Sequence, residues 1–157
     1  MPLKALARLA ALLALLLPGP AWAACTLSAT TLAFGNYSPR APAIVSSVGT
    51  IRLTCTALLQ LNVQYTITLS AGGGGSYGAR RMTTGGAATT LAYQLYRDAA
   101  GTSVWGDGSA GTATVQGVES LVLLGSGRNI SVYGRLPARQ NVAPGVYADT
   151  VMVTVTY

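Results

Sequence analysis

Residues 62–70 read NVQYTITLS, and apolar side chains occupy every second position of this stretch. A period of two is the spacing of a β-strand, because successive side chains of a strand point to opposite faces. The pattern predicts a strand that buries Val63, Tyr65, Ile67 and Leu69 and exposes the polar residues between them. After the first two dozen residues, no long stretch has apolar residues at helical spacing, so we expect an all-β fold.

Three further stretches repeat this period and are predicted to be strands. They are residues 49–55, with Ile51, Leu53 and Cys55 inward, residues 91–95, and residues 128–136, with Ile130 and Val132 aligned. Turn-forming segments rich in glycine lie between and after them, at 71–78, 83–86, 105–108, 125–127 and 143–145. Short strands with frequent turns in a chain of this length predict one antiparallel β-sandwich domain.

The last thirteen residues, GVYADTVMVTVTY (145–157), form the most strand-like segment of the chain. Alternation places Val151, Val153, Val155 and Tyr157 on one face. Two interpretations fit this pattern. The segment is either an ordinary last strand of a complete sandwich, or the edge of a sandwich that lacks a neighbouring strand and exposes its backbone beside an open groove.

The N-terminal residues have the pattern of a secretory signal peptide. Lys4 and Arg8 precede the apolar run 9–17, which is followed by Pro-Gly-Pro and by Ala21-Trp22-Ala23. The run is about half the ~20 residues that span a bilayer. We therefore expect residues 1–23 to be removed, residues 24–157 to form the exported domain, and no membrane span in the mature protein.

The two cysteines, Cys25 and Cys55, both lie in the exported part. An even pair in an oxidising compartment predicts a disulfide. Lipid modification of Cys25 is the alternative, but Trp22 stands where a lipoprotein signal has a leucine-like residue.

The charge pattern argues against a nucleic-acid partner. Removal of Lys4 and Arg8 leaves eight arginines against four acidic residues, a net charge of +4. These arginines are scattered singly or in one pair, without the clustered basic stripe of a nucleic-acid interface. They are interpreted as surface charge that keeps the protein soluble.

The exported residues offer little for catalysis or metal binding, so an enzyme is not expected. There is no His, and after residue 23 there is no Lys and one Glu. Asp98 and Asp107 lie in turn-like contexts, where Asp bonds its own backbone. The glycine run 72–75 lacks the GK[ST] of a phosphate loop and is interpreted as a hairpin loop. No cofactor and no metal site are predicted.

Several local motifs together are similar to those of one family. They are CTLSATTLAFGNY (25–37), GTIRLTC (49–55), YTITLS (65–70), RRM (80–82), LAYQLYRD (91–98), VWGDG (104–108), SVYGRLPARQNVAPGVYADTV (131–151) and VTVTY (153–157). The chain resembles the spore coat protein U domain family, which includes secreted pilin-like subunits of archaic chaperone-usher fimbriae.

This resemblance implies an immunoglobulin-like sandwich that lacks its last strand. A periplasmic chaperone would complete the fold first, and a strand donated by a neighbouring subunit would then replace it. The implied partners are this chaperone, an outer-membrane usher and other pilus or coat subunits. The implied function is a non-catalytic structural subunit of an extracellular fimbria or coat that supports adhesion or biofilm.

The resemblance also assigns residues. Cys25 and Cys55 match the family's disulfide, and Val151, Val153, Val155 and Tyr157 become the expected edge of the groove for chaperone and donor strand. The remaining matches are structural: Phe34, Gly35, Tyr93, Leu95, Tyr96, Trp105, Gly106, Asp107, Gly108, Gly145, Tyr147 and Asp149.

Two further expectations concern the role of the chain. Cleavage after Ala23 leaves only Ala24 before Cys25, without the extension that serves as donor strand in polymerising subunits. This predicts a terminal or minor subunit, or a self-contained coat protein, and not the repeating shaft subunit. The alternative function is a secreted, monomeric carbohydrate-binding sandwich. Its candidate contacts would be four aromatic residues expected to be exposed, Tyr77, Tyr96, Trp105 and Tyr133.

Overall fold

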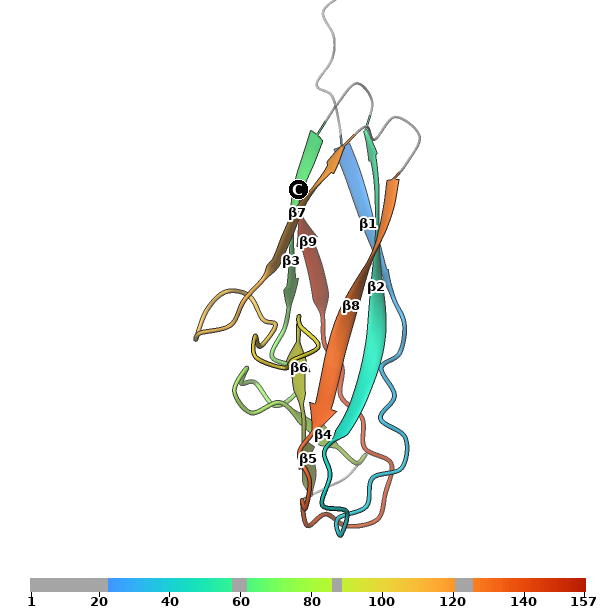
Figure 1. Cartoon of the computed structure of the whole chain (residues 1–157), viewed down its shortest axis with the longest axis vertical. Coiled ribbons are helices and arrows are strands. Elements are labelled where there is room, and N and C mark those ends of the chain that lie inside the picture. Colours follow the sequence, from blue (N-terminus) through green and yellow to red (C-terminus); the bar gives the residue numbers. More distant parts are fainter. Residues whose placement is uncertain (1–22, 58–61, 86–88, 121–125) are drawn as a thin grey trace, which may run out of the picture.

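The computed structural model describes residues 23–57, 62–85, 89–120 and 126–157 (Figure 1). Within these residues the only regular secondary structure is β-strand, which confirms the predicted fold class. The strands are β1 (Ala23–Ala29), β2 (Val45–Ala57), β3 (Asn62–Leu69), β4 (Arg81–Thr83), β5 (Thr90–Ala92), β6 (Gln94–Tyr96), β7 (Val115–Ser120), β8 (Ser126–Leu136) and β9 (Val153–Thr156). Of the predicted signal peptide only Ala23, which begins β1, lies within the described residues.

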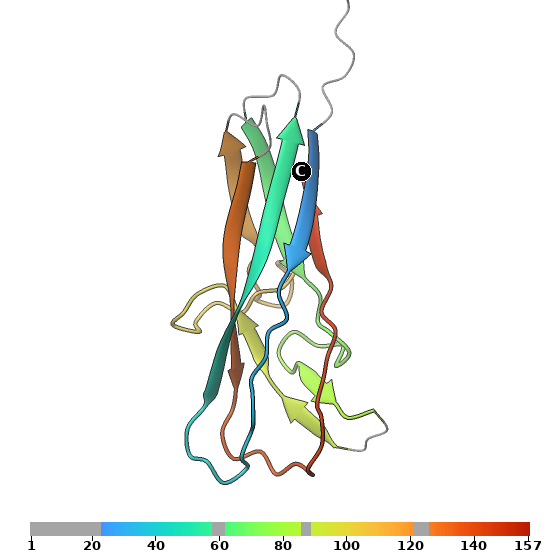
Figure 2. The ribbon, with the colours of Figure 1, turned by 90° about the vertical axis from the view of Figure 1, so that its right-hand side faces the viewer.

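Two antiparallel sheets face each other along an elongated molecule (Figures 1 and 2). The first has the strand order β1-β2-β8-β6 and the second the order β7-β3-β9. A third, two-stranded sheet, β4-β5, lies near the end of the molecule farthest from the start of β1 (Figure 1). This arrangement is the predicted β-sandwich.

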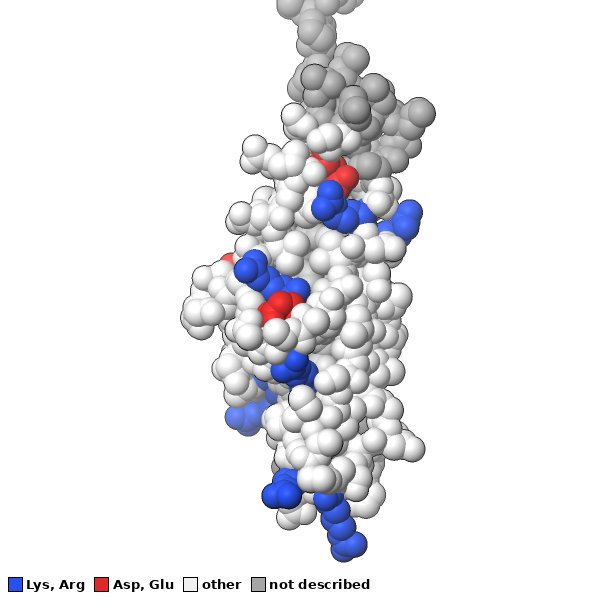
Figure 3. All heavy atoms as spheres, viewed as in Figure 1, with Lys and Arg blue, Asp and Glu red and all other residues white. Residues whose placement is uncertain are grey.

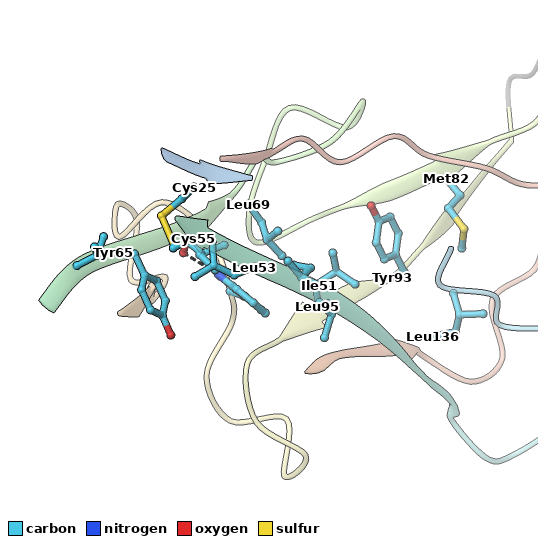
Figure 4. Packing of buried hydrophobic residues seen from close by; sticks show 14 of the residues in the cluster. Cys25, Ile51, Leu53, Cys55, Tyr65, Leu69, Met82, Tyr93, Leu95 and Leu136 are labelled. Atoms are coloured by element: carbon cyan, nitrogen blue, oxygen red, sulfur yellow. Dashed lines mark hydrogen bonds between the residues drawn. A yellow bond between two sulfur atoms is a disulfide. The ribbon is translucent and has the colours of Figure 1, made fainter. Parts of the chain in front are cut away.

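The core lies between the sheets, and the predicted inward faces form its centre (Figure 4). In β3 the four alternating apolar residues are all buried, and in β2 Ile51, Leu53 and Cys55 are buried as well. Trp105 fills the space between them with none of its surface exposed, and its Nε1 donates a hydrogen bond of 3.1 Å to the carbonyl oxygen of Ile67.

Cys25 and Cys55 form a disulfide between directly opposed residues of β1 and β2. The bond therefore ties the edge strand of the first sheet to its neighbour. The two cysteines are 30 residues apart in the sequence. In the chain-entropy model, closing a loop of this length stabilises a fold by roughly 3 to 4 kcal/mol.

Several predicted elements differ from the structure. The turn predicted at 125–127 overlaps β8, which already begins at Ser126. The stretch 91–95 is divided at Tyr93, because Tyr93 N donates to Arg80 O and the chain passes there from β5 to β6, which belong to different sheets. The glycine run 72–75 joins β3 to β4 of another sheet, so it is a crossover and not a hairpin.

The last strand is also shorter than its sequence pattern. Only Val153–Thr156 pair with β3. Upstream, Ser70 N still donates to Met152 O at 2.9 Å, but β3 has ended at Leu69 and the chain turns away. Residues 137–152, which lead from β8 into β9, belong to no strand. They bend at Ala138 and at Pro144–Gly145 and form one isolated bridge, between Ala148 and Thr83.

Candidate strand-binding groove

Two strand edges face each other at one side of the sandwich. Within the described residues, β1 pairs only with β2 and β9 pairs only with β3. β1 and β9 run beside each other without forming a backbone ladder (Figure 2). Each therefore has a free edge of peptide N–H and C=O groups, which is the feature that a further strand recognises.

Below these strands the two chain segments that continue from them enclose a groove. Residues 29–37, the last residue of β1 and the segment after it, form one wall. Residues 142–151 together with Val153 form the other, which we call the C-terminal wall. The groove has a volume of about 960 Å³. Its floor is the apolar core itself, contributed by Ile51, Leu69, Met82, Leu91, Tyr93, Leu95, Val132 and Leu136.

In the C-terminal wall, the alternation of the backbone determines which N–H and C=O groups are free to bond an added strand. Met152 turns its backbone toward β3, since its C=O accepts from Ser70 N and its N–H donates to Ser70 Oγ, both at 2.9 Å. Neighbouring residues of an extended chain direct their N–H and C=O to opposite sides. Val151 and Val153 therefore present their backbone to the groove and their half-buried side chains to its interior.

The four residues predicted for this edge divide into two groups. Val151 and Val153 line the groove. Val155 packs against the core beyond it, opposite Ile67, and Tyr157 is 54% exposed beside Thr66 and Gln116 of the second sheet. Tyr157 is thus not brought together with the others.

The C-terminal wall is fastened by side chains in place of a strand partner. The Gln140 side-chain amide makes the two hydrogen bonds to Ala92 that the backbone of a neighbouring strand would make. Its Oε1 accepts from Ala92 N at 2.7 Å and its Nε2 donates to Ala92 O at 2.8 Å. Tyr147 hydroxyl donates to Ala143 O at 2.8 Å and lies 3.2 Å from Thr89 Oγ1. These bonds hold the wall without using the backbone of Val151 or Val153.

Asp149 fixes the same wall from inside. Its carboxylate accepts hydrogen bonds from the Tyr93 hydroxyl at 2.6 Å and from Gly73 N at 2.8 Å. Burial raises the pKa of Tyr93, and the hydrogen bond to Asp149 raises it further, so the phenol stays protonated and donates.

The opposite wall rests on two glycines of the first sheet. Leu32 and Phe34 lie over Gly134, where an added methyl group would come within 2.8 Å of either side chain, and Leu32 also contacts Gly49. The Phe34 ring meets that of Tyr93 edge-on at 6.2 Å between centroids. Gly35 follows with a φ of +70°, a bend that favours glycine.

Tyr37 closes the groove at its far end. Its hydroxyl donates to Pro137 O at 3.1 Å and accepts from Gln140 N at 2.6 Å. One side chain thus connects the wall that follows β1 to the segment that leads into the other wall.

Arg80 is an organising residue that the sequence did not reveal. Its side chain is completely buried and not part of the surface charge. Its guanidinium donates to Ser70 O at 2.8 Å, to Gln94 Oε1 at 2.7 Å and to Trp105 O at 2.7 Å. Desolvation lowers the pKa of Arg80. Its three oxygen partners are neutral and connect the residue after β3, Gln94 of β6 and the turn at Trp105. Its place in the RRM motif was the only sequence signal.

The other motif residues have structural positions. Leu95 belongs to the buried core, and Gly106 is buried against Thr112. Asp98 and Asp107 have the predicted turn role, since each accepts from backbone N–H groups of its own loop, including Thr102 N and Ser109 N. Gly108 has a φ of +92°, and Gly145 is exposed in the C-terminal wall.

Two observations concern other kinds of site. Among the described residues, no group of three or more His, Cys, Asp or Glu could hold a metal ion. In the same part of the chain, no helix is long and apolar enough to cross a membrane. The four aromatics expected to be exposed are also not equivalent, because Trp105 is entirely buried and cannot contact a ligand.

Comparison with known proteins identifies the family. The Spore Coat Protein U domain matches residues 13–154. The chain belongs to this family. Its relative Protein U of Myxococcus xanthus shares 32% identity with it, over 81% of this chain and 72% of that protein.

The fold of this Spore Coat Protein U domain is similar to that of a pilus subunit structure. A chain in the CsuC–CsuE chaperone–tip adhesion subunit pre-assembly complex, from archaic chaperone-usher Csu pili of Acinetobacter baumannii, superposes with a TM-score of 0.55 at 20% identity. The match covers 87% of this chain and 40% of the length of that chain. The likeness establishes a shared sandwich fold.

Proposed function

We propose that the protein is a non-catalytic structural subunit of an extracellular fimbria or coat, assembled by accepting a β-strand from a partner. The observation that carries this proposal is the apolar groove enclosed by the segments that adjoin β1 and β9, together with the backbone edges that these two strands leave unpaired within the described residues. Main-chain groups at such an edge supply affinity, and pockets for alternate side chains supply specificity.

The expected energy of strand binding is large for this fold. A strand that places about four apolar side chains in the groove gains roughly 1.5 to 3 kcal/mol for each, or on the order of 6 to 12 kcal/mol. Ordinary domains have a total stability of about 5 to 15 kcal/mol. Occupation of the groove would therefore decide whether the subunit persists, which suits a protein that is passed from one partner to the next.

Family membership and the shared fold support particular partners. We infer that a periplasmic chaperone occupies the groove after export, that an outer-membrane usher receives the complex, and that a strand from another subunit replaces the chaperone. The protein would then reach the cell surface or the medium as part of a fibre or coat, where it supports adhesion or biofilm.

The position of the predicted cleavage site favours a terminal or minor subunit. Ala23 and Ala24 already pair with Ala57 and Thr56 in β1, so a mature chain that starts at Ala24 would have no residues to donate. Sequencing the N-terminus of the exported protein tests this role. A mature start well before Ala23 would contradict it.

A thermal-shift experiment tests strand acceptance. Peptides copied from the donor segments of co-encoded subunits are added to the exported protein, and one of them is expected to raise the melting temperature markedly. The substitution Val151→Asp, in the groove, should abolish this shift, whereas Met152→Asp should retain it because Met152 is 69% exposed and faces away. Circular dichroism verifies that both variants are folded. A shift that Val151→Asp leaves unchanged, or no shift with any peptide, would mean that the groove does not accept a strand.

A further inference from the structure

The outer face of the β1-β2-β8-β6 sheet has an unusual composition. Side chains that alternate with the buried ones point to solvent here, and β1, β2 and β8 lie in front in Figure 2. Hydroxyl groups dominate the face, with cross-strand pairs such as Thr26 with Thr54 and Thr50 with Ser131. Among the outward positions of these four strands, none is Asp or Glu.

Three large side chains form one row across this face. Val48 pairs with Tyr133, and Tyr133 pairs with Tyr96, so the three residues lie side by side on β2, β8 and β6. Val48 is 59% exposed, and both tyrosines are half-buried. Tyr96 and Tyr133 are two of the four aromatics expected from the sequence to be ligand contacts, and the sheet register brings them together.

Arg135 fixes one end of this row. Its guanidinium lies over the Tyr96 ring, 5.5 Å from the centroid, and its Nη2 donates to Ala99 O at 2.6 Å. The loop that supplies Ala99 is itself ordered, since the Asp98 carboxylate accepts from Thr102 N at 2.9 Å and Ser103 N at 2.7 Å. These hydrogen bonds, that from Thr102 first, lower the pKa of Asp98. The Asp98 carboxylate is thus hydrogen-bonded within its own loop, and this loop in turn holds Arg135 over the Tyr96 ring.

Arg52 provides a second positive charge farther along the sheet. It is exposed in the middle of the hydroxyl rows, opposite Asn129, whose Oδ1 lies 3.5 Å from its Nη1. Val48 and Arg52 are four residues apart on one strand, a separation of roughly 13 Å. On the face of the molecule seen in Figure 3, charged residues also form small separate groups on a largely uncharged surface.

We propose that this face, the outer platform formed by Val48, Tyr96, Tyr133, Arg135 and Arg52, binds an acidic polysaccharide. The C–H face of a sugar ring is apolar and matches a tyrosine ring, and hydroxyl rows offer hydrogen bonds to a sugar chain. Arginine forms strong charge-assisted bonds with carboxylates, and the absence of acidic side chains on the four strands makes the platform complementary to an anionic chain.

The platform is independent of the groove. Its side chains point away from the core, whereas the groove opens onto the core between the sheets. A subunit with an occupied groove would therefore still expose Val48, Tyr133 and Arg52. The inference does not rest on the proposed function, and a failure of either leaves the other standing.

Binding of the exported protein to galacturonic acid oligomers, compared with dextran oligomers of equal length, tests the proposal. We expect saturable binding of the acidic oligomer at moderate salt and much weaker binding of the neutral one. Tyr133→Ala and Arg52→Glu should each weaken binding on the order of tenfold, as expected for central contacts of an interface.

Two matched variants control for composition and charge. Tyr157→Ala removes another exposed tyrosine, and Arg40→Glu reverses another exposed arginine, both outside the platform. Neither should change the affinity. Equal losses for Arg40→Glu and Arg52→Glu would show that net charge alone attracts the ligand and would overturn the proposal. An unchanged affinity in Tyr133→Ala, confirmed as folded by its melting temperature, or equal binding of dextran, would overturn it too.

Discussion

β3 and β9 are neighbours in one sheet and have the same alternating sequence pattern, but their inward side chains have different surroundings. Val63, Tyr65, Ile67 and Leu69 of β3 are at most 3% exposed, whereas Val153 and Val155 of β9 are only half-buried. Among the strands that the structure describes, β3 has a partner on both sides and β9 on one. The comparison shows that alternation determines which face a residue occupies, while the presence of neighbouring strands determines how completely it is covered.

Truncating a side chain of the central strand should have the largest effect. Ile67→Ala is expected to lower the free energy of unfolding by about 2 to 5 kcal/mol, because it removes fully buried atoms and leaves a cavity. Chemical denaturation measures this loss. The matched change Val155→Ala, directly opposite on β9, should cost clearly less. Equal losses would show that β9 is as well covered as β3.

Filling the groove should reduce this difference. Val153→Ala is expected to cost about 1 kcal/mol in the free protein and about 1 kcal/mol more when a donor-strand peptide is bound, because the bound strand completes the burial of the side chain. Melting curves with and without peptide give both values. If the cost were the same in both states, the peptide would not be covering β9.

Removing the Tyr93 hydroxyl tests how the segment before β9 is held. Tyr93→Phe is expected to lose about 1 kcal/mol at neutral pH, since Asp149 loses a hydrogen bond. The pKa of Tyr93 is raised in the folded protein, so its contribution is complete below the ordinary tyrosine pKa of 10.0 and falls as the pH rises above it.

Denaturation between neutral pH and pH above 10 therefore separates the two proteins. The wild type should lose stability in the alkaline range more steeply than Tyr93→Phe. Parallel curves would mean that the phenol of Tyr93 titrates equally in the folded and unfolded states.

The smallest effect is expected on the outer side of β9. Thr154→Asp changes an exposed residue between two inward valines and should shift the free energy of unfolding by no more than about 0.5 kcal/mol. Urea denaturation gives the value, with wild type measured in parallel. A loss similar to that of Val153→Ala would indicate that both faces of β9 are covered.

Much of the fold could be predicted from the sequence, because the local alternation of apolar and polar residues determines where strands form and which faces are buried. The inward faces of β2 and β3, the turn roles of Asp98 and Asp107, and the Cys25–Cys55 pair were all predicted. Other features depend on the tertiary fold. The C-terminal pattern continues upstream of Val153, yet the strand begins only there, because its partner β3 ends at Leu69 and nothing in residues 145–152 themselves shows that they lack a partner.

The sequence predicts the C-terminal edge of the groove better than it predicts the contacts that hold the walls of the groove. Leu32 and Phe34 lie over glycines that are distant in sequence, and Gln140 imitates a strand for Ala92, 48 residues away. Arg80 looks like any surface arginine, because nothing local shows that four neutral oxygen contacts will enclose its charge. Such roles arise from contacts that only the folded chain creates.

The disulfide also has a mechanical consequence. It links β1 covalently to the interior of its sheet, whereas β9 is held to β3 by hydrogen bonds over Val153–Thr156. In the assembly proposed above, a strand bound between these two edges would pull on both when the assembly is stretched. Separating β1 from β2 beyond Cys25 requires breaking a sulfur–sulfur bond. Tension would therefore detach β9 from β3 first. The position of the cysteine pair thus determines which of the two edges gives way.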